Sequence, residues 1–308
     1  MAEPKFYSPL KIGLLIVTVA YFLFTFHALF TLAWIGEWEY LGGGSAAFWI
    51  FITDVSAYFG LVFRFIASLI SAVAIIFYFA KKGLPAPTAF KVLRWILVLE
   101  AIYWVPLFLS GVMGFLPVDL SGFGETTGLS LGLLITTGIP CLVSSIAIPI
   151  ALFKLASKLN VNKPMKDAIK WGLIAGTVYV FVFWLNNTGM WIATLMSKGT
   201  EYLTTYPENL LSFALTTIGL LALAVFTAYF TKKTVGTETL EKLKLKTLGA
   251  IIVALGLYFL WNYLTWIFFG RPELWSDWYA WFLGHNLDLW MLSLPLVGLP
   301  LLFKRSDS

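Results

Sequence analysis

Apolar residues run along this chain in eight long segments, with short polar connections between them. An α-helix of about 20 residues crosses the roughly 30 Å hydrocarbon core of a bilayer, and every segment reaches that length. The pattern therefore predicts an all-helical, polytopic membrane bundle of eight transmembrane helices, in a single integral-membrane domain over residues 1–308. The expected spans cover residues 12–35, 48–80, 92–115, 129–153, 168–196, 208–231, 247–269 and 278–303.

The spans also group into four hairpins of similar length, each turning at an acidic connection. Asn187-x-x-x-Trp191 in the third hairpin recurs as Asn262-x-x-x-Trp266 in the fourth. This recurrence indicates either an internal repeat or tryptophans that settle independently at one membrane depth.

The connections alternate in charge. One side carries eighteen basic and five acidic residues, and the other carries two basic and eight acidic residues. Since basic connections stay in the cytoplasm, we expect a multi-pass protein of the cell membrane with both termini cytoplasmic. The lysines are spread over every inner connection and not gathered on one face, which argues against a nucleic-acid partner.

Composition agrees with the membrane class. Hydrophobic residues make up 59% and charged residues 12%, whereas a soluble domain is about half apolar and a quarter charged. The lone cysteine, Cys141, excludes an intrachain disulfide and a cysteine metal cluster. The absence of glutamine is typical of thermophile proteins. No nucleotide, zinc-protease or serine-hydrolase motif is present, so the sequence leaves open whether the chain is an enzyme.

Polar side chains inside the spans lie at matched distances from inner lysines. The separation is 16 residues, or 17 for Arg64, and it places them about 24 Å above the inner boundary. Helices that carry polar groups at one depth should turn them inward, so we expect a substrate-binding layer in the outer half of the membrane. The layer comprises His27, Arg64, Asn186, Asn262 and Asp288, with Thr216 at the same height.

Arg64 is expected to pair with Asp288, because an unpaired arginine at this depth is costly and cannot lose its proton. The pair would either fix helix packing or line a ligand or proton site. Glu100 lies nine residues beyond Lys91, well below the layer, and is expected to be protonated or to have another partner.

The last segment carries the candidate catalytic residues. Trp281, His285 and Asp288 are spaced i, i+4, i+7 and so share one helical face. A quinol head group needs a proton acceptor, a hydrogen bond and an aromatic wall. His285 with Asp288 would accept the proton, Trp281 would form the wall, and Asn262 or His27 would add the hydrogen bond.

His27 and His285 are the two histidines of the chain. They have three interpretations: axial ligands of one b-type haem, hydrogen-bonding groups for a quinone or for Asp288, or packing residues. Quinone is the favoured cofactor, haem b is the less favoured one, and no other metal site is expected.

Tryptophans concentrate near the outer boundary of the membrane. A simple aromatic belt would instead place tryptophans at both membrane interfaces. The excess indicates either a docking surface for other subunits of a membrane complex or an uneven belt. These residues are Trp34, Trp38, Trp49, Trp191, Trp266, Trp275, Trp278 and Trp281.

In helix number, size, outer-half polar site and scarcity of haem ligands, the chain resembles the eight-helix quinol-interacting membrane subunits of respiratory complexes. It is similar to the polysulfide-reductase-anchor type and to the polytopic companion subunit of archaeal b-type cytochromes. The resemblance implies a respiratory subunit that binds quinol near its outer face, and no catalytic residue is carried over from it. A small-molecule or ion transporter that uses the polar layer, and a structural subunit without chemistry of its own, are the two alternatives.

Overall fold

The computed structural model describes residues 7–34, 45–80, 85–113, 115, 134–160, 162–205, 207–239, 242–269 and 289–303. The described elements are all helical. They are α1 (Tyr7–Trp34), α2 (Ser45–Ala80), α3 (Ala86–Trp104), α4 (Leu107–Met113), η3 (Leu134–Gly138), α6 (Ile139–Lys158), α7 (Met165–Lys198), α8 (Glu201–Thr205), α9 (Pro207–Ala214), η4 (Leu215–Gly219), α10 (Leu220–Thr234), α11 (Leu245–Phe269), α13 (Leu289–Leu292) and α14 (Pro295–Leu302).

Seven helical stretches in the described part of the chain are long and apolar enough to cross a membrane. This finding supports the predicted helical membrane bundle. The eighth predicted span, residues 278–303, is described only from residue 289 onward. There it consists of the two short helices α13 and α14, separated by a turn before Pro295. Proline lacks the N–H that a continuous helix needs, which explains the interruption.

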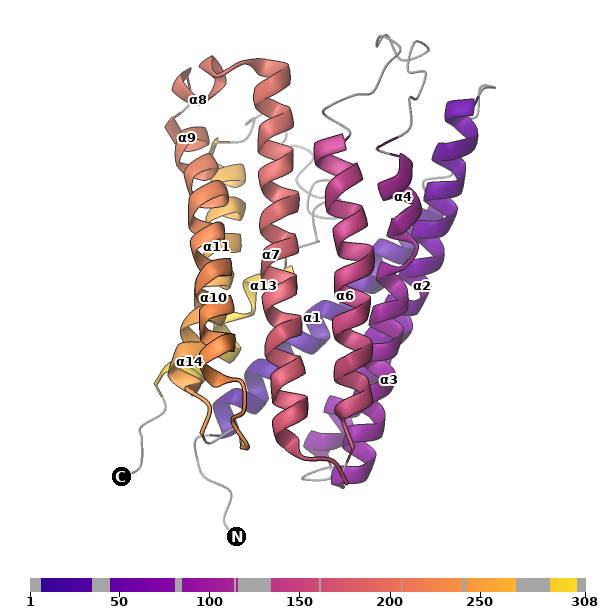
Figure 1. Ribbon diagram of the computed structural model, residues 1–308, viewed down its shortest axis with the longest axis vertical. Coiled ribbons are helices and arrows are strands. Elements are labelled where there is room, and N and C mark those ends of the chain that lie inside the picture. Colours follow the sequence, from indigo (N-terminus) through magenta and orange to yellow (C-terminus); the bar gives the residue numbers. More distant parts are fainter. Residues whose placement is uncertain are drawn as a thin grey trace.

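The helix α7 stands at the centre of the bundle, between α6 on one side and α10 with α11 on the other (Figure 1). Its Ala175 and Val182 pack with Ala101 of α3 and Ile148 of α6 in one buried cluster. The helix also contributes Ile169 to a second cluster, with partners from α10 and α11. Neighbouring helices therefore cover two faces of α7, while Phe181 and Met190 stay exposed.

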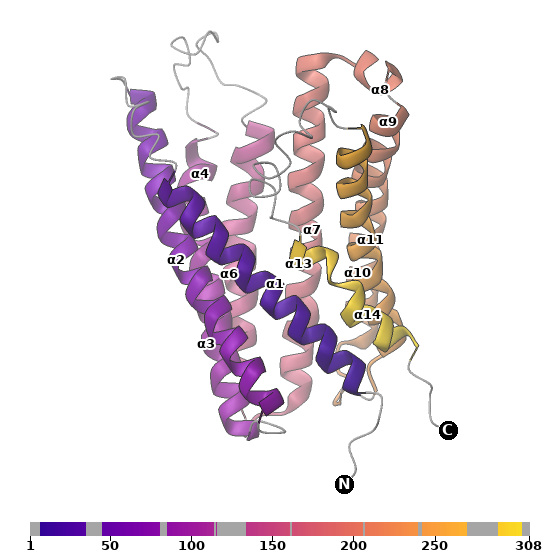
Figure 2. The same cartoon turned by 180° about the vertical axis from the view of Figure 1, so that it is seen from behind.

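The first helix, α1, crosses the others diagonally (Figure 2). Near its start Gly13 packs against the backbone carbonyl of Leu296 in α14. In its second half Phe22 and Phe26 contact the ring of Phe65 in α2, with centroids 5.8 and 6.2 Å away. The helix α1 thus joins the side of the bundle that holds α2 to the side that holds α14.

Two π-helical segments, Leu134–Gly138 and Leu215–Gly219, precede α6 and α10 and lie on either side of α7. Gly189 of α7 approaches the first segment so closely that an added Cβ would meet the Ile135 carbonyl oxygen at 2.6 Å. Small residues at such crossings let membrane helices come into backbone contact.

Candidate functional site

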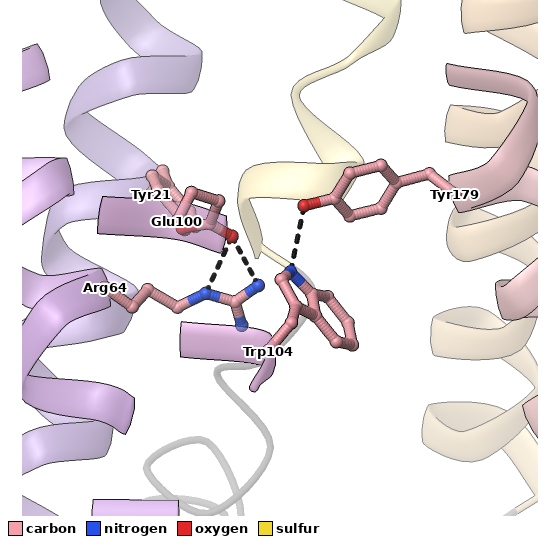
Figure 3. A network of polar contacts seen from close by, with 5 residues as sticks. All are labelled: Tyr21, Arg64, Glu100, Trp104 and Tyr179. Carbon is pink, nitrogen blue, oxygen red and sulfur yellow. Dashed lines mark hydrogen bonds and ion pairs between the residues drawn. The ribbon is translucent and has the colours of Figure 1, made fainter. Parts of the chain in front are cut away.

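Arg64 of α2 and Glu100 of α3 form an ion pair inside the bundle (Figure 3). Arg64 donates from Nε and Nη2 to Glu100 Oε1, over 3.0 and 2.7 Å. Their side chains are 13% and 15% exposed. Charges removed from water to this degree are costly unless each one neutralises and hydrogen-bonds the other.

A third helix completes the carboxylate's environment. Tyr21 of α1 donates its hydroxyl to Glu100 Oε2 over 2.9 Å. The buried hydroxyls of Thr25 and Ser68 meet at 2.5 Å, one turn along α1 from Tyr21 and one turn along α2 from Arg64. The polar contacts therefore connect α1, α2 and α3 at the same place.

Aromatic rings surround the guanidinium. Its Cζ lies 3.5 Å from the centroid of the Tyr103 ring and 5.3 Å from that of Trp104. Trp104 in turn donates its Nε1–H to the hydroxyl of Tyr179 on α7 over 3.0 Å. The two rings meet edge to face at 5.7 Å, so the aromatic group extends from α3 to α7 (Figure 3). A cation held against ring faces is stabilised most where water is excluded.

Donors on two residues of this cluster, Arg64 and Tyr179, remain available. Arginine has five N–H donors, and within the described chain the two on Nη1 of Arg64 meet no hydrogen-bond acceptor. The Tyr179 hydroxyl accepts from Trp104, and its own proton has no acceptor among the described residues. The cluster can thus donate hydrogen bonds to an oxygen acceptor of a flat molecule while aromatic rings contact its faces.

The structure gives Arg64 a different partner from the expected Asp288, which lies outside the described residues. The depth assigned to Glu100 was wrong because it was measured from Lys91, five residues inside α3. From the α2–α3 connection, Glu100 is 14 residues beyond Ala86 and Arg64 is 16 residues before Ala80. With a rise of about 1.5 Å per residue, the two side chains lie at nearly the same height.

The other predicted site residues that the structure describes do not belong to this cluster. His27 is half-buried in α1, Asn186 is exposed on α7, and Asn262 is half-buried in α11. Trp281 and His285 lie outside the described residues, as Asp288 does, so the proposed catalytic face and the haem arrangement stay predictions. Thr216 is fully buried, as a member of the polar layer should be.

A second polar region surrounds Thr216 in the π-helical segment η4. Its hydroxyl and that of Tyr258 in α11 are 2.8 Å apart. Trp184 of α7 donates to the backbone carbonyl of Thr217 over 3.0 Å. A π-helical turn disturbs the regular i→i−4 ladder, so a side-chain donor from the neighbouring helix meets a carbonyl that the turn presents.

Sequence inspection placed Glu100 at the wrong depth and overlooked Tyr21, Tyr103, Trp104 and Tyr179. A signal was present for two of these four: Trp104 is four residues from Glu100 on α3, with Tyr103 beside it. A carboxylate next to aromatic residues within a span marks a position that needs a cationic partner. Nothing in the sequence indicates that α1 and α7 would supply Tyr21 and Tyr179.

No protein-family model matches the chain, and neither the curated proteins nor the solved structures include a significant match. The fold and the geometry of the site are therefore the basis for a function.

Proposed function

We propose that the protein is an integral membrane subunit of an electron-transfer complex and that it binds a quinone or quinol head group at the Arg64–Glu100 cluster. The observation that carries this proposal is the combination of a buried ion pair, an aromatic enclosure and unused donors on Arg64 and Tyr179 in one place. A quinone head group is flat, apolar on its faces and bears carbonyl oxygens, which matches each of these features.

In this scheme Arg64 Nη1 and the Tyr179 hydroxyl donate to one quinone oxygen, and Tyr103 with Trp104 contacts the ring. Oxidation of one quinol releases two protons and two electrons. Glu100 accepts one proton from a quinol hydroxyl, and the second proton leaves to water. Both electrons pass to an iron–sulfur or haem centre of a partner subunit. Arg64 and Tyr21 hold the Glu100 carboxylate in position for this transfer.

The wider assignment is part of the same proposal. It comprises eight spans, cytoplasmic termini and a partner docked on the tryptophan-rich outer face. Trp281, His285 and Asp288 would form either the outer wall of this site or a second proton acceptor. The start of α1 and the end of α14 lie at the same end of the bundle, as this topology requires (Figure 2).

The test is quinone binding by the purified protein in lipid nanodiscs, followed by tryptophan fluorescence quenching and by extraction of bound quinone. Tyr179→Phe removes one donor without removing packing, and we expect it to weaken binding by about tenfold, the equivalent of one good hydrogen bond. Tyr258→Phe is the matched control, since it removes a buried hydroxyl in the second polar region. Unchanged binding in both Tyr179→Phe and Glu100→Gln would reject the site.

A transporter is the second candidate, and the interrupted helices favour it. Regular α-helix is interrupted at the π-helical segments on either side of α7 and between α13 and α14. Interrupted helices of this kind often line the substrate path of a transporter. Proton flux into liposomes, recorded with a pH-sensitive dye, separates the two functions. Flux that Glu100→Gln abolishes, in a protein that retains no quinone, would establish the transporter. If the protein shows neither proton flux nor bound quinone, the structural-subunit alternative would be favoured.

A further inference from the structure

A group of lysines surrounds the contact between α7 and α10 at the basic end of the bundle. Thr231 of α10 bonds to the hydroxyl of Thr177 over 2.8 Å and approaches the carbonyl oxygen of Leu173 at 3.3 Å. These contacts place Thr231 level with Leu173. Lys170 lies three residues below Leu173 on α7, and Lys232 directly follows Thr231 on α10. The two lysines therefore lie within about one helical turn of the same height.

Both lysines are exposed and form no ion pair with any described residue. Two lysines at the α6–α7 connection are already engaged: Lys158 lies 3.6 Å from Asp167, and Lys163 donates to the carbonyl oxygen of Ser157 over 2.8 Å. Lys166, one turn from Lys170 on α7, is exposed as well. The α7–α10 contact thus carries uncompensated positive charge in a fixed position.

Apolar side chains continue from these lysines along the outside of the bundle. On α10 they include Tyr229, 56% exposed, and Val225, 61% exposed, and on α7 Phe181 is 42% exposed. Lys170 and Phe181 are eleven residues apart, which is three helical turns on nearly one face. A basic rim beside an exposed apolar stripe is complementary to an anionic phospholipid. The lysines match its phosphate, and the apolar stripe matches its acyl chains.

We propose that Lys166, Lys170 and Lys232 bind the phosphate of an anionic phospholipid whose acyl chains lie along α7 and α10. The occupant is a lipid of the surrounding bilayer, because the lysines border the surface that the hydrocarbon covers. This site is independent of the quinone proposal.

The test uses the full-length protein in nanodiscs that contain equal amounts of phosphatidylglycerol and phosphatidylcholine. Native mass spectrometry after gentle delipidation counts the lipids that remain bound. We expect wild type to retain phosphatidylglycerol preferentially. Lys170→Gln/Lys232→Gln should reduce that retention at least fivefold, because each basic residue near an anionic headgroup contributes about a fivefold effect. Lys170→Arg/Lys232→Arg should restore it.

The matched control removes two lysines at the same end from other helices, Lys91→Gln on α3 and Lys154→Gln on α6. Both are exposed, and the change in net charge is identical. We expect the control to retain phosphatidylglycerol as wild type does. Equal loss in the two double variants would show diffuse charge attraction and overturn the site, as would undiminished retention in Lys170→Gln/Lys232→Gln. A thermal unfolding curve for every variant confirms that the bundle is intact.

Discussion

The bundle contains two buried polar regions that are stabilised in opposite ways. The Arg64–Glu100 cluster joins α1, α2 and α3 through full charges, and each charge depends on the other. The Thr216–Tyr258 region joins η4, α7 and α11 through neutral hydroxyls and a backbone carbonyl. A charge that loses its partner inside a membrane keeps its whole desolvation cost, whereas a hydroxyl can turn toward a nearby carbonyl. The first region should therefore be intolerant of single changes and the second tolerant.

The largest expected effect is on the ion pair. Arg64→Leu alone, or Glu100→Leu alone, should destabilise the protein by about 3–5 kcal/mol, since each leaves a buried charge unpaired. Arg64→Leu/Glu100→Leu should recover much of that loss. The measurement is a double-mutant cycle from equilibrium unfolding in mixed micelles. Additive effects would show that the two side chains are not coupled.

The neutral region should respond less. Tyr258→Phe leaves the buried Thr216 hydroxyl without its partner, and we expect a cost of about 1 kcal/mol, within the range of interhelical hydrogen bonds in membrane proteins. The double variant Thr216→Val/Tyr258→Phe should lose no more unfolding free energy than Tyr258→Phe alone. A loss as large as that of Arg64→Leu, in the same unfolding assay, would contradict the contrast between the two regions.

The third prediction compares one side-chain hydrogen-bond donor from each region. Tyr21→Phe removes the tyrosine bond to Glu100, and Trp184→Phe removes the indole bond to the Thr217 carbonyl. Bonds to a charged acceptor are roughly twice as strong as neutral ones. Tyr21→Phe should therefore cost about 1–2 kcal/mol and Trp184→Phe about half as much, by unfolding free energy. The reverse order would mean that Tyr21 contributes little to holding the carboxylate.

The smallest effect is expected at the exposed pair of Lys242 and Glu238, 3.9 Å apart outside the bundle core. Glu238→Gln should change the unfolding free energy by less than about 0.5 kcal/mol, because water screens this pair. This small cost provides the baseline for the same measurement on the buried Arg64–Glu100 pair, which salt should screen much less. A cost above 1 kcal/mol at Glu238 would indicate a contact beyond the single lysine.

The amino-acid sequence was sufficient to predict the class of protein. It was also sufficient to predict that Arg64 needs a neutralising partner. Long apolar segments have few stable forms other than membrane helices, and an arginine inside one must be neutralised, so both conclusions follow from local chemistry. It also indicated that Thr216 would be buried, and the structure agrees.

Tertiary structure alone decided which acid neutralises Arg64 and which helices surround the pair. Asp288 and Glu100 were both chemically suitable, and the choice between them depended on where α3 begins, not on residue type. Tyr21 joins the cluster because α1 crosses the bundle diagonally, and Tyr179 joins because α7 is central. Helix tilt and the order of neighbouring helices arise from packing contacts between residues far apart in the chain. The spacing of residues within one segment therefore cannot predict either.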